Sequence, residues 1–358
     1  QMFIKEKDHL REISRIRVAE GRNLEKGLRL DRNERVDAWG KELLSKIFDE
    51  KPDYFLSIYP ELNTLYEKLA KFHKIGEENL LLTSGIDGGI KTIFEILTNP
   101  KDKVGVVSPT YAMYNVYSNL FQTNLSEIKY SEDLKFNHDA FDSFLNDNPK
   151  VFFLPNPNQP IESCFDLNEL KIFAKKTLEK NCLFFVDEAY YFFGSESSID
   201  LIREFPNVVV ARTFSKGFGV PSIRLGYLIS SKENMEVLSK TRFAHESNAL
   251  SNSIAEYLID NFNIVEDYNR QVIESREFIK SELSNLKINS YGNKGNYLLI
   301  DLKNQTFASE FVEILRDNLV YVKGPWKKPW ERYITISIGP KESMEKFLDQ
   351  IKMFSKKL

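Results

Sequence analysis

Two residues that could take part in catalysis stand at or shortly after the ends of short apolar runs. Asp187 follows the run CLFFV, and Lys216 follows NVVVA with small and hydroxyl residues around it. A carboxylate at the end of a buried strand is costly unless a cation faces it, so we expect a positive group opposite Asp187. A lysine whose pKa is lowered can act as a nucleophile and then as a base. Lys216 could therefore form an imine with an aldehyde.

The polar residues near these two positions suit a phosphate and an aromatic ring. The stretch SGIDGG follows the apolar run LLLT, and its glycines could open a helix whose first N–H groups bind a phosphate. An arginine fork also suits a phosphate. A lysine, a buried acid, phenols and a phosphate cup together match pyridoxal phosphate, whose ring accepts electrons while an acid keeps its nitrogen protonated. The further members of the set are Gly85, Tyr111, Tyr190, Thr213, Ser215 and Arg224.

The elements that position these residues follow a regular alternation. Each apolar run has the length of a strand and is followed by a turn signal and then a helical pattern. This pattern is typical of a mainly parallel sheet with helices on both faces, in which ligands bind beyond the carboxyl ends of the strands. The predicted strands are 79–83, 103–109, 151–157, 182–189 and 207–213.

The length of 358 residues favours two lobes. A charged helical pattern covers 255–287, and the alternating strands 296–302 and 333–339 come after it. We therefore predict three parts. They are an N-terminal segment, 1–44, packed on the small domain, a large cofactor-binding domain, 45–250, and a small C-terminal α/β domain, 251–358.

Composition narrows the class of partner. The chain has 49 Lys and Arg, 52 Asp and Glu, and a net charge of −3, with no long run of one sign. Neither nucleic acid nor a membrane surface is expected as a partner, which leaves small molecules. The two cysteines and four histidines show no metal-ligand spacing, and the N-terminus is too charged for a secretory signal. We expect a cytoplasmic enzyme without a metal.

The ordered motifs resemble the fold-type I enzymes of the class I and II aminotransferases, and within them the histidinol-phosphate aminotransferase-like branch. The resemblance extends from LRLDRNER, residues 28–35, to ITISIGP, residues 334–340. It implies a large α/β domain, with a mainly parallel mixed sheet flanked by helices, and a smaller α/β domain. It also implies a pyridoxal phosphate-dependent transaminase that moves an amino group from a donor amine to an acceptor carbonyl by a ping-pong route.

The resemblance implies a role for each matching residue. Lys216 would form the internal aldimine and move the proton between the substrate and the cofactor. Asp187 would pair with the pyridine nitrogen, Tyr190 would bind the ring hydroxyl, and Tyr111 would stack on the ring. Tyr59 would reach the phosphate of the neighbouring subunit, which implies a homodimer. The implied phosphate contacts are Gly85, Ile86, Asp87, Thr213, Ser215 and Arg224.

The sequence departs from the family pattern in the loop NPNQPIE, residues 156–162. Gln159 stands where the family has an asparagine that binds the ring hydroxyl, and we expect its amide to keep that contact. Ile161 and Glu162 replace a threonine and a glycine. This change implies a different turn, with either a side chain near the mouth of the pocket or a neutral substitution.

A second departure affects the substrate. The family places an arginine four residues before the glycine that is Gly339 here, where it grips the substrate α-carboxylate, and this position is Thr335. In one reading, another cation takes over, with Arg32, Arg35 and Lys323 as candidates. In the other, which we favour, the substrate lacks the usual α-carboxylate. A phosphate- or phosphonate-bearing amine and aldehyde pair, such as 2-aminoethylphosphonate, or a modified sugar would then fit.

Three alternative functions stay open at this point. The chain could be a histidinol-phosphate aminotransferase proper. It could also decarboxylate a phosphorylated amino acid, as threonine-phosphate decarboxylases of the same branch do. A non-catalytic paralogue that binds the cofactor is the remaining alternative, although Lys216, Asp187 and Arg224 are all present.

Overall fold

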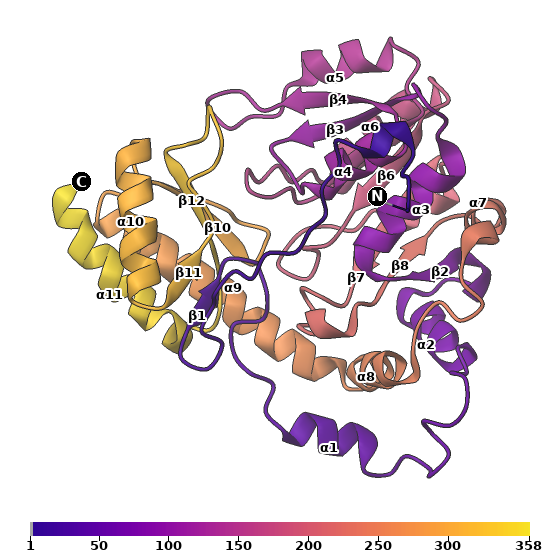
Figure 1. The fold of residues 1–358 in the computed structure, drawn as a ribbon, viewed down its shortest axis with the longest axis horizontal. Helices are drawn as coiled ribbons and strands as arrows, with labels where there is room; N and C mark the ends of the chain where they lie inside the picture. Colours follow the sequence, from indigo (N-terminus) through magenta and orange to yellow (C-terminus); the bar gives the residue numbers. More distant parts are fainter. Residues whose placement is uncertain (1–2) are drawn as a thin grey trace.

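A seven-stranded mixed sheet forms the centre of the larger lobe in the structure, a computed structural model that describes residues 3–358 (Figure 1). Its strand order is β2-β8-β7-β6-β5-β3-β4, and β8 is antiparallel to both of its neighbours. The other neighbouring pairs are parallel, so the predicted mainly parallel sheet is confirmed. The strands are β2 (Leu80–Thr83), β3 (Lys103–Ser108), β4 (Asn124–Lys129), β5 (Val151–Pro155), β6 (Leu183–Asp187), β7 (Val208–Thr213) and β8 (Gly226–Ile229).

Helices on both faces explain why the central strands are continuous apolar runs. Every residue of β5 and β7 is buried. Along β5, Phe152 packs into the core on one face and Phe153 into the core on the other. Helices α2 (Asn63–His73), α5 (His138–Leu145), α6 (Leu167–Leu178) and α8 (Ala249–Asp260) contribute to the Phe152 side, and α3 (Gly85–Leu97), α4 (Met113–Leu120) and α7 (Lys232–Leu238) to the Phe153 side.

A smaller lobe holds two short sheets. One is antiparallel, in the order β12-β10-β9, and in the other β1 pairs in parallel with β11. An isolated bridge between Lys323 and Thr335 joins the two sheets. The elements are β1 (Leu28–Leu30), β9 (Ser290–Tyr291), β10 (Tyr297–Asp301), β11 (Val320–Val322), β12 (Tyr333–Ser337), α9 (Phe262–Asn285), α10 (Gln305–Asp317) and α11 (Glu345–Phe354).

Two of the three hydrophobic cores meet along α9. Val265, near its start, packs into the core of the large sheet, whereas Tyr268 and Val272 pack into the core of the smaller lobe. The helical pattern expected over 255–287 is divided between α8 and α9 at Asn261. The domain boundaries at 44 and 250 stay predictions.

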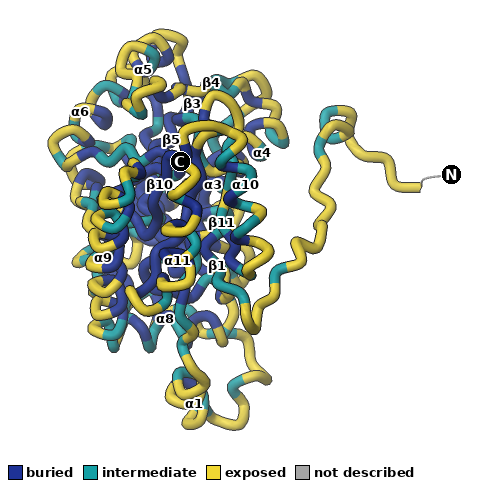
Figure 2. Tube along the Cα trace, turned by 90° about the vertical axis from the view of Figure 1, so that its left-hand side faces the viewer, coloured by how far each residue is buried: buried dark blue, intermediate teal, exposed yellow. Residues whose placement is uncertain are grey.

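The N-terminal part of the chain contacts both lobes. β1 adds to β11 of the smaller lobe, while Arg15 donates to Sδ of Met113 in α4 at 3.4 Å. Residues 3–27 are mostly exposed and run along the outside of the molecule (Figure 2). Helix α1 (Glu42–Phe48) follows β1 in the chain. None of the helices among the described residues is long and apolar enough to pass through a membrane.

Candidate active site

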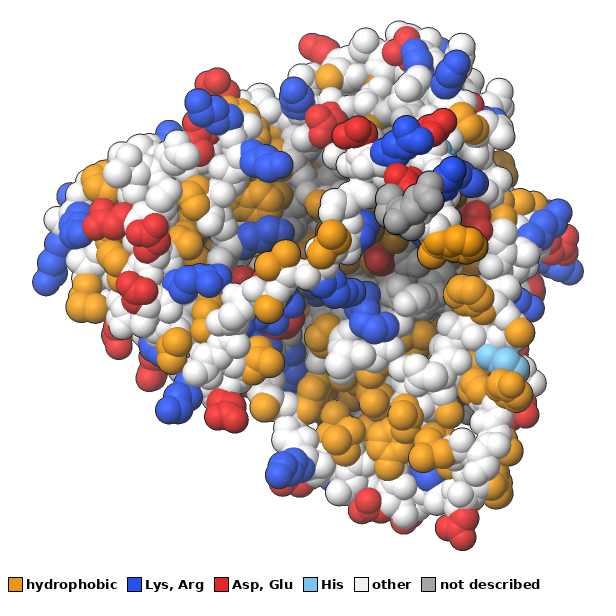
Figure 3. Space-filling view, in the orientation of Figure 1, with side chains coloured by type: hydrophobic (Ala, Val, Ile, Leu, Met, Phe, Trp, Pro, Cys, Tyr) orange, Lys and Arg blue, Asp and Glu red, His pale blue; other side chains and the backbone are white. Residues whose placement is uncertain are grey.

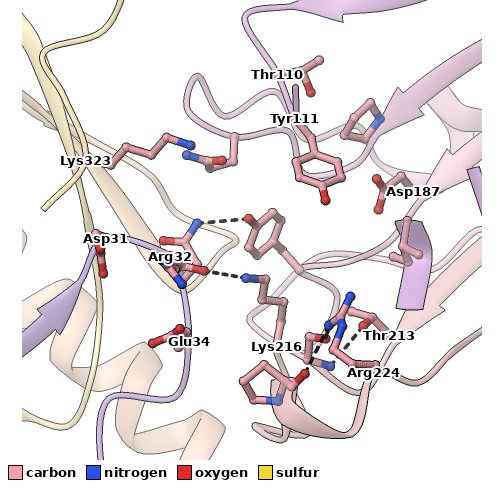
Figure 4. Close-up of a pocket in the computed structure, with 17 residues that line it drawn as sticks. Asp31, Arg32, Glu34, Thr110, Tyr111, Asp187, Thr213, Lys216, Arg224 and Lys323 are labelled. Carbon is pink, nitrogen blue, oxygen red and sulfur yellow. Dashed lines mark hydrogen bonds between the residues drawn. The ribbon is translucent and has the colours of Figure 1, made fainter. Parts of the chain in front are cut away.

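A cavity of about 380 Å³ lies where the carboxyl ends of the central strands face the smaller lobe. Figure 3 shows a hollow at this junction, with Lys and Arg side chains along its walls. Loops that follow β3, β5, β6 and β7 form one wall, and the loop after β1 and the residue after β11 form the other (Figure 4). The lining residues are Asp31, Arg32, Asn33, Glu34, Ile86, Thr110, Tyr111, Pro155, Gln159, Asp187, Tyr190, Thr213, Ser215, Lys216, Pro221, Arg224 and Lys323.

Most of the residues predicted from the sequence meet in this cavity. Three of them lie outside its lining. Gly85 is next to it, Asp87 accepts a hydrogen bond from the Tyr117 hydroxyl at 3.0 Å, and Tyr59 is 76% exposed, with its ring stacked on that of His245. Those that line the cavity are Ile86, Tyr111, Gln159, Asp187, Tyr190, Thr213, Ser215, Lys216 and Arg224.

Lys216 extends from the end of β7 toward the opposite wall. Its Nζ donates to the backbone carbonyl of Arg32 at 2.7 Å and lies 5.8 Å from the centre of the Tyr190 ring. Burial lowers the pKa of the Lys216 amine to about 8, although the nearby Glu34 carboxylate opposes this shift. An appreciable fraction of the amine is therefore neutral, and so nucleophilic, near neutral pH.

Asp187 is a buried acid whose hydrogen bonds come from neutral donors. The Tyr114 hydroxyl donates to Oδ2 at 2.6 Å, and the backbone N–H of Ala189 donates to Oδ1 at 3.0 Å. Burial raises the pKa of the Asp187 carboxyl to about 6, against the lowering effect of the Tyr114 hydrogen bond. Neutral donors leave the negative charge without a cation, and a protonated ring nitrogen is the group that would balance it.

Arg224 forms one side of an anion cradle. Its backbone adopts the left-handed region, with φ of +50°, which is uncommon for a residue other than glycine and is often found at functional sites. Its Nη1 donates to the Pro221 carbonyl at 3.1 Å and to Ser215 Oγ at 3.4 Å. Arg224 thus lines the cavity with its guanidinium next to the hydroxyl of Ser215.

The other side of the cradle is the N-terminus of α3. Gly85 has φ of +66°, and a Cβ there would lie 3.0 Å from Nη2 of Arg224. A Cβ on Gly226 would come within 2.7 Å of the Gly85 backbone. Only glycines allow this close approach, which brings the first N–H groups of α3 beside the arginine. The donor set fits a phosphate, and with Lys216 and Asp187 it fits pyridoxal phosphate.

The loop after β1 supplies cavity residues that the sequence analysis missed. Asn33 is buried, and its Nδ2 donates to the Tyr190 hydroxyl at 3.0 Å. Burial raises the pKa of Tyr190, so its phenol stays neutral and can donate in turn. Asp31 and Glu34 are held by Arg22 and Arg29. The feature of the sequence that could have identified these residues is the run of polar residues directly after β1. Thr110 and Tyr114 were missed as well, on either side of the predicted Tyr111.

The opposite wall shows what stands at the position of the family arginine. Thr335 is buried, and its Oγ1 accepts a hydrogen bond from Trp326 Nε1 at 2.8 Å. Thr335 and Lys323 exchange two backbone hydrogen bonds, of 3.0 and 2.7 Å, and the Lys323 side chain lines the cavity. Arg332 instead binds the Asp301 carboxylate with two hydrogen bonds.

The other two candidate cations differ from Lys323. Arg32 lines the cavity, but its guanidinium forms an ion pair with Glu20. Arg35 lies between the rings of Trp39 and Tyr268, at 3.8 and 3.6 Å from their centres. Of the three candidates, Lys323 is therefore the one that lines the cavity and forms no ion pair within the described residues.

Comparisons of the sequence identify relatives over most of its length. Residues 23–351 match the family described as aminotransferase class I and II. A histidinol-phosphate aminotransferase of Clostridium botulinum is 30% identical over 318 residues, which cover 85% of each chain. A dihydroxyacetone phosphate transaminase of Campylobacter jejuni is 30% identical over 313 residues, covering 84% of this chain and 83% of the relative.

Solved structures show the same fold. The histidinol-phosphate aminotransferase of Sinorhizobium meliloti, in complex with pyridoxal 5′-phosphate, matches with a TM-score of 0.84 at 21% identity, over 92% of this chain and 91% of that one. The histidinol-phosphate aminotransferase of Clostridium acetobutylicum matches with a TM-score of 0.81 at 20% identity, over 92% and 100%. The predicted fold-type I architecture is confirmed.

Proposed function

The chain belongs to the class I and II aminotransferase family, whose members use pyridoxal phosphate, and from this we propose that it transfers the amino group of a small phosphate- or phosphonate-bearing amine. The observation that carries the substrate class is the pair of Lys323, whose side chain lines the cavity, and Thr335, whose side chain is turned to Trp326.

The residues of the strand ends would hold the cofactor. Arg224, Ser215 and the N-terminus of α3 would bind its phosphate, and Asp187 would balance the charge of the ring nitrogen. When bound, pyridoxal phosphate supplies a ring that accepts electrons from the substrate carbon. Lys216, with its pKa near 8, can release and take up a proton at the pH of the cell. Asn33 keeps the Tyr190 hydroxyl in place.

The cation of the substrate wall can bind a phosphate but lacks the fork that grips an α-carboxylate. An arginine grips a carboxylate through two parallel hydrogen bonds, whereas a lysine ammonium is a point charge that binds a phosphate without that planar match. Lys323 is such a point charge, and the hydroxyl of Thr335 is already engaged. Two relatives are named for phosphate-bearing substrates, histidinol phosphate and dihydroxyacetone phosphate, and this supports a substrate of the same class.

Paired amines test this proposal. Absorbance spectra of the holoenzyme would be recorded with histidinol phosphate and histidinol, and with 2-aminoethylphosphonate and ethylamine, following conversion of the cofactor to pyridoxamine phosphate. We expect the phosphorylated or phosphonylated member of at least one pair to react much faster than its partner. Equal rates within both pairs, with glutamate reacting normally, would overturn the proposed substrate class and leave an ordinary amino-acid transaminase.

The proposal includes a homodimer in which Tyr59 reaches the site of the partner subunit. The segment around α1 exposes a group of apolar side chains (Figure 3), as an interface between subunits requires. Mixing Tyr59→Ala and Lys216→Ala subunits would test it, because each mixed dimer regains one intact site only if Tyr59 acts across the interface. The exposed residues are Leu44, Tyr54, Leu56, Ile58 and Tyr59. A cytoplasmic location stays a prediction.

A further inference from the structure

Glu162 binds a turn of the smaller lobe from a loop of the large one. Its carboxylate accepts hydrogen bonds from the backbone N–H groups of Asn293 and Lys294, each at 2.9 Å. These residues belong to the GNKGN turn, residues 292–296, between β9 and β10. Hydrogen bonds to an ionised acceptor are roughly twice as strong as neutral ones. The glycine that the family has at this position could not make them.

The same turn is also held by the loop that follows β6. Lys294 Nζ donates to the Gly194 carbonyl at 2.9 Å. The buried Arg276 donates from Nη1 to the carbonyls of Phe193 and Gly295, both at 2.9 Å. The 292–296 turn therefore lies between the loops that follow β5 and β6, which carry Gln159 and Tyr190 into the cavity.

Tyr297, the first residue of β10, links the turn to those cavity residues. Its hydroxyl donates to the backbone carbonyl of Asn158, next to Gln159. Its ring packs edge-on against Tyr190, with centres 4.8 Å apart. A shift of the turn would therefore also move Asn158 and Tyr190.

The turn also connects to the substrate wall through the small sheet. In the antiparallel register Leu299 of β10 lies opposite Thr335 of β12, and Thr335 bridges to Lys323. The other face of β10 and β12 packs into the core of the smaller lobe, so these strands move together, while Leu299 itself packs into the core of the large sheet. Contacts at the 292–296 turn thus influence how far Lys323 lies from the cofactor residues.

We propose that Glu162 is a positioning residue that fixes the substrate-binding Lys323 relative to the cofactor-binding Tyr190. The inference rests on the proposed function for the role of Lys323. Without the carboxylate, the turn keeps the contacts of Tyr297 and Arg276, so cofactor binding persists while the distance between the two walls varies more. A misplacement of about 1 Å can cost up to about 100-fold in rate, and a partly held turn should cost less.

The test compares Glu162→Ala and Glu162→Gln in the holoenzyme, with Glu196→Ala as the control. Glu196 also accepts a backbone hydrogen bond, from Leu167, but within the large lobe. We expect Glu162→Ala to raise KM for the phosphate-bearing amine roughly tenfold with a smaller change in kcat, and to leave the cofactor bound. Glu162→Gln, which keeps one acceptor oxygen, should recover part of this loss, and Glu196→Ala should match the wild type.

Hydrogen exchange at residues 293–297 and 155–160 is the second measurement, and it does not depend on activity. Faster exchange in both segments of cofactor-free Glu162→Ala is the expected result. Unchanged KM together with unchanged exchange overturns the proposal. If the wild type shows no preference for phosphorylated amines, the proposed function fails, and the exchange data still decide whether Glu162 holds the turn.

Discussion

The two walls of the cavity are built in different ways. On the large-sheet wall, two charged groups are held in part by residues close to them in the sequence: Asp187 by the N–H of Ala189, and Arg224 by the carbonyl of Pro221. On the opposite wall, Lys323 is placed by its pairing with Thr335 and by contacts between lobes. Local hydrogen bonds help to make the first wall rigid and its residues predictable from the sequence. Tertiary pairing places Lys323 on the second wall, so that wall can change when the substrate changes.

The largest effect should come from the large-sheet wall. Lys216→Ala removes the amine that exchanges protons in the cavity, so kcat should fall at least about 10³-fold. Steady-state kinetics with saturating pyridoxal phosphate would measure it, with Lys327→Ala, an exposed lysine outside the cavity lining, as the control. A comparable loss of kcat in the two variants would mean that Lys216 is not a catalytic residue.

A change in the opposite wall should affect binding more than rate. Lys323→Met removes the cation but keeps the length of the side chain. Hydrogen bonds to charged groups contribute about 1.5–3 kcal/mol, so KM for the phosphate-bearing amine should rise between roughly tenfold and 100-fold. The KM of its unphosphorylated analogue should hardly change. An equal rise in KM for both amines would show that Lys323 does not bind the phosphate.

The pH dependence of cofactor attachment can sharpen the description of the first wall. Lys216 has its pKa lowered to about 8, and only the neutral amine attacks an aldehyde. The rate at which the cofactor-free chain binds pyridoxal phosphate covalently should therefore rise roughly fivefold from pH 7 to 8, and by less than about twofold from pH 8 to 9. A tenfold rise per unit across the whole range would mean an amine with an ordinary pKa.

The buried acid should lower the stability of the cofactor-free chain. Burial raises the pKa of Asp187 to about 6, so between its ordinary pKa and 6 the folded chain binds a proton that the unfolded chain has lost. Stability therefore falls as the pH rises through this window, and the penalty is complete above pH 6. Asp187→Asn should raise Tm at pH 7.5 by at least roughly 2 °C, and the difference should vanish near pH 3. The Tyr114 hydroxyl can accept from the new amide.

The smallest effect is expected at Gln159. Its side chain lines the cavity with one methylene more than the family asparagine, and a flexible amide can adjust its reach. Gln159→Asn should change kcat/KM by no more than about threefold, the lower range for a single neutral hydrogen bond. A larger gain or loss would show that the loop after β5 has been remodelled around the cofactor, and that this part of the wall is less rigid than the rest.

The sequence predicted the parts of the fold and site that depend on local pattern. Buried strands produced clear apolar runs, and the residues after them line the cavity. The strand β4 was missed because it lies at the edge of the sheet, with an exposed and polar sequence. The strand β8 was missed as well, although it is buried and as long as the predicted β2. The contribution of Asn33 and the contacts of Glu162 could not be predicted, because both depend on which distant segments the two lobes bring together.

The antiparallel strand β8 has a consequence for the order of events during synthesis. It pairs with β2 at one side and β7 at the other, and so joins the beginning of the large sheet to its end. Gly85 and Arg224, the two halves of the phosphate cradle, become neighbours only once this pairing is made. A growing chain on the ribosome therefore cannot form the cradle before β8 has emerged and paired.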